Sequence, residues 1–430
     1  MPAEAPTNPG PVREWCAKLR KRCDQVAEAQ AKKRAEQWRA RLLADWGRTR
    51  REVFQWVGGG PAPPPLLAQR PDGWTGAAEE VDEAMRRDWL PIFARYATSG
   101  APDFSAFKQR FGPYVKRRPM QLERLTVGDL RATLSRMKVA SAGGRDGWRI
   151  RELKQLPDVL LQSLLEVFEC AETGGGWPAA LQEVVVSLIP KGEGGAPLAQ
   201  RPVTVLSGVY RLWAATRARQ MLDWQEEWIV EAPRGFRRGH SCWHLYWEAG
   251  LAVEDALLRG EEDLCGVLFD YAKCFDRVPQ ELLFWVAEET GMHERLLRPM
   301  RSVYAGMRRR FKTGQGLGAQ WSATNGILQG CPLSVVALNL LVALWANAVG
   351  EEVPEAVARA FADDTGARAK GEKAPEVIEK VIRLTEEYAG LSDQELNGKK
   401  TAGFAIGSQH KAAMAALSVN GQPLGLVGEV

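Results

Sequence analysis

Apolar positions along the middle of the chain recur with two periods, one typical of strands and one typical of helices. The β-branched run 184–189 predicts a strand, and residues 264–269 are almost continuously apolar, as in a central strand that is covered on both faces. Residues 334–349 are apolar nearly all round, which predicts a buried helix, whereas 375–388 carry apolar side chains on one face. The pattern therefore predicts that strands and helices alternate through this region.

Local start and stop signals bound further elements. Pro279 and Gly291 bracket the helix expected between them, because proline suits the start of a helix and glycine its end. Thr126 and Asp129 resemble a capping box, which predicts that a helix begins there. Residues 360–367 have the pattern of a β-hairpin with two aspartates at its turn. These signals place charged residues next to predicted strand and helix ends.

Composition changes along the first third of the chain predict its organisation. Glycines and prolines dominate residues 58–65, and they interrupt regular structure because proline lacks an amide donor and glycine lacks backbone restriction. The predicted parts are a basic helical segment at 1–57, a Pro/Gly-rich linker at 58–75, a helical region at 76–124 and a main domain at 125–430.

Charge and cysteine usage narrow the class of protein. The 430 residues carry a net charge of +4, but the first 55 contain 13 Lys/Arg against 7 Asp/Glu, so the basic character is local and suits contact with phosphate at chosen surfaces. Arg301 and 308–312 supply five further cations, predicted as a nucleic-acid surface or, alternatively, a solvated helix face. Seven cysteines without a C-x-x-C pair argue against a disulfide framework and a structural zinc. No uncharged apolar run reaches the roughly 20 residues of a membrane span, so we expect a soluble, intracellular protein with no membrane contact.

Three short motifs carry the candidate chemistry. Asp270 ends the apolar run 264–269, and Asp363 and Asp364 follow Phe361-Ala362. A carboxylate at the end of a buried strand is costly unless it binds a cation or caps another element. Mg²⁺ prefers a few hard carboxylate oxygens, and nucleotidyl transfer uses two such ions about 3.5–4 Å apart. The motifs therefore predict a magnesium site, while Asp276 is expected to cap the turn into the next helix.

The ordered motifs 268–278, 326–334 and 361–364 resemble the reverse-transcriptase domain of non-LTR (LINE-type) retrotransposons, and the resemblance extends from about Leu125 to the C-terminus. It implies an α+β right-hand polymerase fold with fingers and palm, preceded by a helical N-terminal extension and ending before the family's thumb. It also implies an RNA-directed DNA polymerase that extends a primer by two-metal nucleotidyl transfer. The expected cofactor is Mg²⁺, two ions for which Mn²⁺ can substitute.

The same resemblance implies roles for individual residues. Asp270, Asp363 and Asp364 would be metal ligands and catalytic residues, with Lys400 as the proton donor to pyrophosphate and Lys399 as a weaker candidate for that role. A bulky ring at Phe275 would exclude a 2′-hydroxyl, so deoxynucleotides are the expected substrates. The implied nucleotide-binding residues are Lys191, Arg201, Phe275, Gln329 and Gly330, and the implied template-binding residues are Gly235, Phe236, Arg237 and Arg238.

The partners implied are an RNA template, a DNA primer or target and a dNTP, with the nucleus as the place of action and the oligomeric state left open. An alternative stays open from the sequence, namely a catalytically decayed remnant that keeps the fold and binds nucleic acid. A viral-type polymerase that copies RNA into RNA is disfavoured, because such enzymes carry a polar residue and an Asn where this chain has Phe275 and Gln329.

Overall fold

The computed structural model describes residues 68–70, 73–190, 196–259 and 263–427, together with scattered helical positions between 14 and 40. The chain divides into two units, 1–63 and 64–430, and every strand and helix from β1 to β13 belongs to the second. Residues 58–67 of the linker predicted at 58–75 lie outside the described residues, and so does the predicted nucleotide-binding Lys191. The described residues of that segment include two short strands, β1 (Ala68–Arg70) and β2 (Gly73–Thr75).

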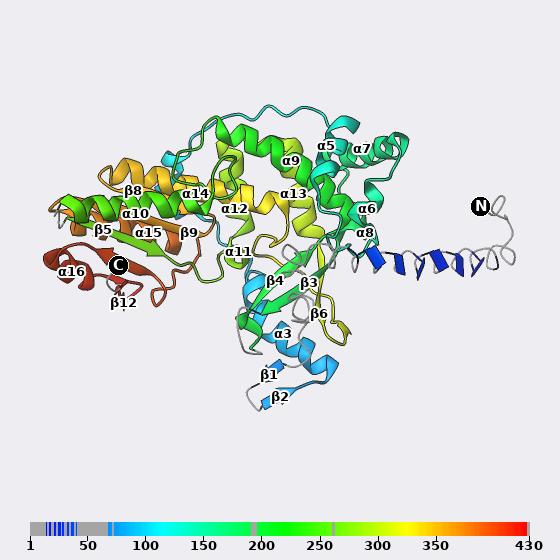
Figure 1. Ribbon diagram of the computed structural model, residues 1–430, viewed down its shortest axis with the longest axis horizontal. Helices are drawn as coiled ribbons and strands as arrows, with labels where there is room; N and C mark the ends of the chain where they lie inside the picture. The colour runs from blue at the N-terminus through cyan, green and yellow to red at the C-terminus, as the bar shows by residue number, and fades with distance from the viewer. Residues whose placement is uncertain are drawn as a thin grey trace. The chain divides into compact units, whose positions relative to one another are not determined.

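A five-stranded sheet forms the larger lobe of this unit (Figure 1). The predicted central strand, β5, spans Leu264–Phe269 and is antiparallel to both of its neighbours, β9 and β10. The prediction that both faces are covered is wrong at Leu268, which is 58% exposed, because its partners on the two neighbouring strands, Ala402 and Gly366, have little or no side chain to cover it. The strand order is β13 (Gly425–Leu426), β10 (Ala402–Ala405), β5, β9 (Asp364–Lys370) and β8 (Val357–Phe361).

Two long helices cover this sheet. Helix α14, Pro332–Glu352, is buried nearly all round, as predicted, and α15, Ala374–Leu391, presents Val377, Val381 and Tyr388 to the core. Within the described residues, α14 is the one helix that is long and apolar enough to cross a membrane, but 89% of its most apolar window is buried inside the protein. It is therefore accounted for as a core helix.

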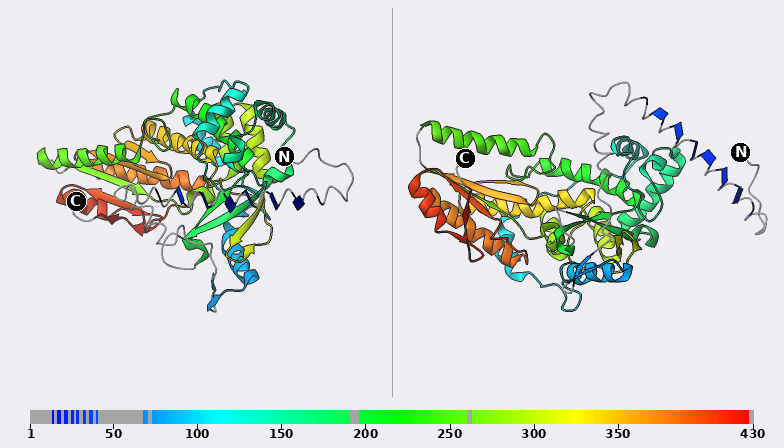
Figure 2. Two further views of the ribbon diagram at one scale, coloured as in Figure 1. Left: turned by 45° about the vertical axis from the view of Figure 1, so that its right-hand side comes forward. Right: turned by 60° about the horizontal axis from the view of Figure 1, so that its bottom comes forward.

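A four-stranded sheet forms the second lobe, with α3 (Ala78–Phe93, light blue in Figures 1 and 2) against it. Trp89 of α3 is fully buried beside Phe311 and Trp321, and its indole N–H donates to the Pro197 carbonyl at 3.0 Å. The helix thus becomes part of the core of this lobe. The strand order is β4 (Gln200–Val205), β3 (Glu183–Pro190), β6 (Arg308–Thr313) and β7 (Gly316–Leu317).

The basic segment 308–312 is a strand, so the alternative of a solvated helix face is wrong. Side chains alternate between the two faces of a strand, and this alternation turns Arg309 inward, where it is 2% exposed. Its guanidinium lies 5.6 Å from the ring centre of Phe93 and 5.5 Å from that of Trp321. The predicted five-cation surface is therefore wrong for Arg309.

Further helices join the two lobes (Figure 1). The predicted capping box is present, since the Thr126 hydroxyl accepts from the Asp129 backbone N–H and the Asp129 carboxylate accepts from Thr126. Glu172 and Arg217 form a fully buried ion pair between two of these helices. These helices are α5 (Val127–Arg136), α7 (Asp158–Thr173), α9 (Gly208–Glu226), α12 (Gln280–Thr290) and α13 (Glu294–Gly306).

Residues before Leu125 also pack on the larger lobe. The ring centres of Phe107 and Phe111 in α4 (Ser105–Phe111) lie 5.1 and 4.9 Å from the ring centre of Tyr388. The Asn347 amide donates to the Tyr114 carbonyl. The shorter elements are β1 (Ala68–Arg70), β2 (Gly73–Thr75), α6 (Ile150–Leu153), α8 (Ala179–Gln182), α10 (Cys242–Arg259), α11 (Cys274–Arg277), α16 (Ser408–Ala415), β11 (Ser418–Val419) and β12 (Gln422–Pro423), with 3₁₀ turns at Gly112–Tyr114 and Pro197–Ala199.

Candidate active site

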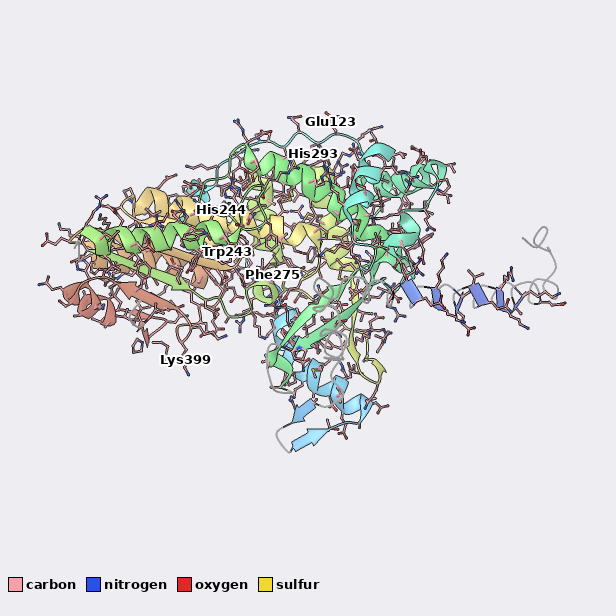
Figure 3. The ribbon with its side chains drawn as sticks, in the orientation of Figure 1. Glu123, Trp243, His244, Phe275, His293 and Lys399 are labelled. Atoms are coloured by element: carbon pink, nitrogen blue, oxygen red, sulfur yellow. The ribbon has the colours of Figure 1, made fainter. Side chains whose placement is uncertain are left out.

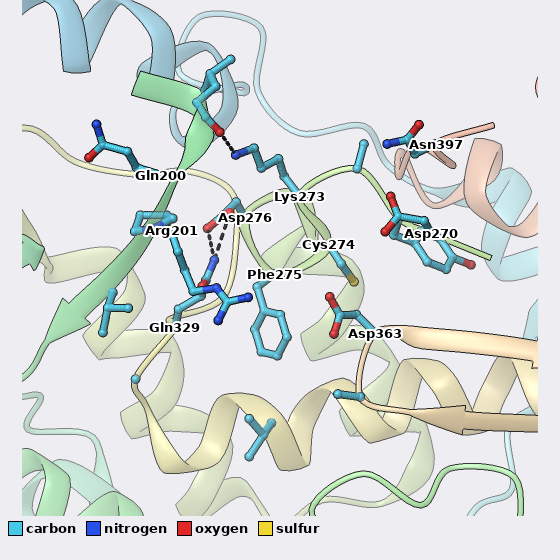
Figure 4. A pocket seen from close by; sticks show the side chains of 18 of the residues that line it. Gln200, Arg201, Asp270, Lys273, Cys274, Phe275, Asp276, Gln329, Asp363 and Asn397 are labelled. Carbon is cyan, nitrogen blue, oxygen red and sulfur yellow. Dashed lines mark hydrogen bonds between the residues drawn. The ribbon is translucent and has the colours of Figure 1, made fainter. Parts of the chain in front are cut away.

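A cavity of about 750 Å³ opens where the ends of the two sheets approach each other (Figure 4). Its lining comes from β4 and the turn before it, the loop after β5, the turn before α14, the β8–β9 turn and the segment before β10. It brings together most of the predicted site, namely Arg201, Phe236, Asp270, Phe275, Gln329, Gly330, Asp363 and Lys400. Among the predicted residues that the structure describes, four are not part of the lining: Gly235, Arg237, Arg238 and Asp364.

Strand pairing places two carboxylates at one end of the five-stranded sheet. Asp270 directly follows β5, and Asp363 lies in the two-residue turn between β8 and β9. Phe269 pairs with Thr365, so the two aspartates are held at the same edge. Within the described part of the chain, neither carboxylate has a hydrogen bond or ion pair to another side chain, and Figure 4 shows both facing the cavity. Unpaired carboxylates in such a place are suited to a cation.

The turn that carries Asp363 depends on a close contact with another segment. Ala362 has a left-handed φ of 59°, which is uncommon for a residue with a Cβ. Gly235 packs directly against this turn, and a Cβ on it would lie 2.3 Å from the Ala362 nitrogen. Gly235 is therefore explained by packing that supports the turn of the metal-site candidate.

Asp364 occupies a different position from its neighbour. It is the first residue of β9 and is exposed, whereas Asp363 faces the cavity. Partial burial raises the pKa of the Asp364 carboxyl, and the charges of Asp363 and Asp270 raise it further. The described residues contain no cluster of three His, Cys, Asp or Glu side chains close enough to form a complete metal cage. The donor set still fits Mg²⁺, which binds through one or two carboxylates and fills its other positions with water and phosphate.

The segment before β10 brings a lysine to the same cavity. The Asn397 N–H donates to the Asp270 carbonyl at 2.7 Å, and the Asp270 N–H donates to the Thr401 hydroxyl at 3.3 Å. These bonds hold Lys400 at the cavity wall. Lys399 is exposed and points away from the body of the protein (Figure 3). The structure thus separates two lysines that are adjacent in the sequence.

Phe275 and Gln329 lie side by side on the cavity wall. The Phe275 ring is partly buried against the core and also faces the cavity (Figure 4). Asp276, the next residue, does not cap the following helix: α12 has Pro279 at its N-cap without a side-chain cap. The Asp276 carboxylate is 3% exposed and accepts two hydrogen bonds from the Gln329 amide nitrogen, at 2.9 and 3.0 Å. Sequence reasoning missed this contact because 53 residues separate its partners.

Two cations line the cavity, one on β4 and one in the loop between β5 and α11. Arg201 is exposed on β4, opposite Ile189 of β3, and its side chain reaches into the cavity (Figure 4). Lys273 also lines the cavity, donates to the Leu198 carbonyl, and places its ammonium 4.5 Å from the ring centre of Trp89. Lys273 was not predicted; its position inside the motif 268–278 was the available signal.

The predicted template segment is a turn whose arginines differ in their surroundings. Arg237 is half-buried, pairs with Glu226 at 2.7 Å and donates to two backbone carbonyls, so it stabilises the turn. Arg238 is exposed and pairs with Asp223 at 2.5 Å across the surface. Phe236 is 48% exposed at the cavity with a left-handed φ of 61°. Phe236 and Arg238 are thus the exposed members of the predicted set.

Comparisons with known proteins agree with this geometry. Residues 189–420, more than half of the chain, match the family described as reverse transcriptase (RNA-dependent DNA polymerase). The chain is also 25% identical over 308 residues to the transposon TX1 uncharacterized 149 kDa protein of Xenopus laevis, a match that covers 68% of this chain and 23% of that protein. This chain therefore spans about a quarter of that relative's length. Both matches support the resemblance to non-LTR retrotransposon enzymes, and the chain belongs to the reverse transcriptase family.

Proposed function

We propose that this chain is the RNA-directed DNA polymerase module of a non-LTR retroelement and extends a primer on an RNA template. The observation that carries the proposal is the pair of carboxylates, Asp270 and Asp363, which have no side-chain partner among the described residues and face a cavity that also presents Arg201 and Lys400. In this proposal the five-stranded sheet with α14 and α15 is the palm, and the four-stranded sheet with α3 forms the fingers.

Asp270 and Asp363 would hold divalent metal, with Asp364 adjoining them. Bound Mg²⁺ ions would activate the primer 3′-hydroxyl and neutralise charge on the transferring phosphate, and Mn²⁺ would serve as a substitute because it also accepts carboxylate oxygens. The carboxylates themselves orient the reacting groups at the sheet edge. Their mutual repulsion disfavours the empty site, and this repulsion would be relieved on binding.

The remaining cavity residues would bind and orient the nucleotide. Arg201 would contact the triphosphate through charge-assisted hydrogen bonds. We propose the same role for Lys191, which follows the last residue of β3 in the sequence. Phe275 would exclude the 2′-hydroxyl of a ribonucleotide. Lys400 would hold the proton that the leaving pyrophosphate takes.

The turn 234–240 would contact the template. Phe236, exposed at the cavity, offers an aromatic face on which a base can stack. Arg238 supplies an exposed cation for a phosphate once it leaves Asp223. Gly235 and Arg237 would act indirectly, by holding the turn against Ala362 and Glu226.

Primer extension on poly(rA)/oligo(dT) by the full chain, with Mg²⁺ or Mn²⁺, tests the proposal. We expect dTTP incorporation by the wild type and a loss on the order of 10³-fold or more in Asp270→Asn and Asp363→Asn, because a two-metal ligand contributes several kcal/mol to the transition state. Asp255→Asn, an exposed aspartate paired with Arg259 on α10, is the matched control and should retain full activity. Absence of extension with retained RNA binding would instead identify a non-catalytic remnant, and more than a tenth of wild-type rate in either cavity variant would refute the metal-ligand assignment.

A further inference from the structure

The contact between Asp276 and Gln329 is partly buried in the cavity wall and joins two separate motifs (Figure 4). Asp276 belongs to α11 and follows Phe275 in the sequence, whereas Gln329 belongs to the turn before α14. Both oxygens of the carboxylate accept from the same amide nitrogen. A hydrogen bond to an ionised acceptor is about twice as strong as one between neutral groups, so this contact favours one orientation of the amide.

The backbone of the Gln329 turn is held independently of that contact. The N–H of Gly326 donates to the Val278 carbonyl at 2.9 Å, and the carbonyl of Gln329 accepts from the Thr204 N–H at 2.7 Å. Gly330 has φ 116°, and a Cβ on it would lie 2.6 Å from the Thr204 carbonyl oxygen. With the backbone held on both sides, the remaining freedom at Gln329 lies in its side-chain amide.

An amide group presents a donor at one end and an acceptor at the other, whereas a carboxylate can only accept. The NH₂ group of Gln329 must therefore face Asp276, and its oxygen must face the cavity. Resting on the function proposed above, we infer that Asp276 is a positioning residue that fixes the Gln329 amide so that the nucleotide cavity presents a hydrogen-bond acceptor at this point. The cavity is thereby suited to a nucleotide group that donates a hydrogen bond, and a rotated amide would present a second donor instead.

A buried cation, Arg309, interacts with the Asp276 carboxylate. Arg309 is buried nearby, and two of its nitrogens, Nε and Nη2, have no hydrogen-bond partner among the described residues. Burial lowers the pKa of Arg309 to about 10, which leaves the guanidinium charged at neutral pH, and the negative charge of Asp276 opposes this lowering. A negative Asp276 therefore offsets a buried positive charge while it holds the amide.

Exchanging the two groups tests the inference. In Asp276→Asn, the new amide offers the Gln329 NH₂ group one neutral acceptor oxygen in place of two charged ones. In Gln329→Glu, two carboxylates face each other. In the double variant D276N/Q329E, the amide introduced at position 276 can donate to the carboxylate introduced at position 329, whose second oxygen still gives the cavity an acceptor. We expect each single variant to raise the KM for dTTP by about 10-fold or more, because a buried polar group loses its partner. The double variant should return to within about 3-fold of the wild type.

Gln280→Glu is the matched control. The Gln280 amide donates to the Gly326 carbonyl at 2.9 Å in the same turn, but Gln280 does not line the cavity. This variant should lower the melting temperature and leave the KM for dTTP unchanged. An unchanged KM in Asp276→Asn, with a lowered melting temperature alone, would assign Asp276 to structure only and overturn the inference while leaving the proposed function intact.

Thermal melting of the wild type, the two single variants and the double variant keeps the two proposals distinguishable. If the wild type extends no primer, the proposed function fails, but the amide orientation is still tested by stability. Both single variants should then melt lower than the wild type, and the double variant should recover most of the loss. Additive losses in the double variant would show that the two side chains are not coupled, and would overturn the positioning role whatever the enzyme activity.

Discussion

Shortening Phe275 separates a role in sugar selection from a role in the core. The ring faces the cavity on one side and packs against the core on the other. If it excludes a 2′-hydroxyl by overlap, Phe275→Val should raise the relative efficiency of ribonucleotide incorporation by roughly 10–100-fold, equivalent to about 1.4–2.7 kcal/mol of relieved clash. Full truncation of a buried phenylalanine costs about 3–5 kcal/mol, so replacement of this partly buried ring by valine should cost only about 1–3 kcal/mol of stability.

The assay is the ratio of kcat/KM for dTTP and UTP on poly(rA)/oligo(dT), measured together with the melting temperature. Phe404→Val is the matched control. Phe404, on β10, is also partly buried, but it packs over Gly266 of β5 and is not part of the cavity lining. The control should lose stability and keep the wild-type sugar ratio. An unchanged ratio in Phe275→Val, with lowered melting like that of the control, would refute the steric role and leave Phe275 as a core residue.

Two further predictions concern charged residues at the cavity. Lys400→Ala should lower kcat by about 10²–10⁴-fold, the usual contribution of a general acid. Lys399→Ala should keep a kcat near that of the wild type, because the Lys399 side chain points outward. Equal losses of the two variants in single-turnover assays would contradict the assignment of Lys400 as the proton donor. The folded-state pKa of Asp364 is raised, so its ionisation costs stability: the cost is absent below the unfolded pKa of about 4 and grows as the pH rises through the folded value. In the absence of metal, Asp364→Asn should therefore raise the melting temperature above that of the wild type by more at pH 7 than at pH 4. An equal gain at both pH values would contradict a raised pKa of Asp364 in the folded state.

Boundaries of individual elements followed from local chemistry. The strand predicted at 264–269 and the helix predicted at 280–290 have the same bounds in the structure. Gly291 ends that helix with a left-handed φ of 102°, a conformation that glycine adopts without a Cβ clash. The capping box at Thr126 formed as predicted for the same reason, because both partners lie within one helical turn. The catalytic motifs and their order could also be identified from the sequence, since each motif is a continuous stretch of residues.

The arrangement of side chains around the cavity depended on contacts between distant segments. Because Phe361 pairs with Asp364, Asp363 lies in the turn and faces the cavity, whereas Asp364 begins a strand. Two identical adjacent residues do not show from the sequence which of them will face the cavity. The burial of Arg309 and the bond from Gln329 to Asp276 arise where separate strands and turns pack together. Local propensity acts over a few residues, whereas register and packing are set by the whole chain, so only the tertiary structure could decide which of these polar groups face the cavity and which are held inside the protein.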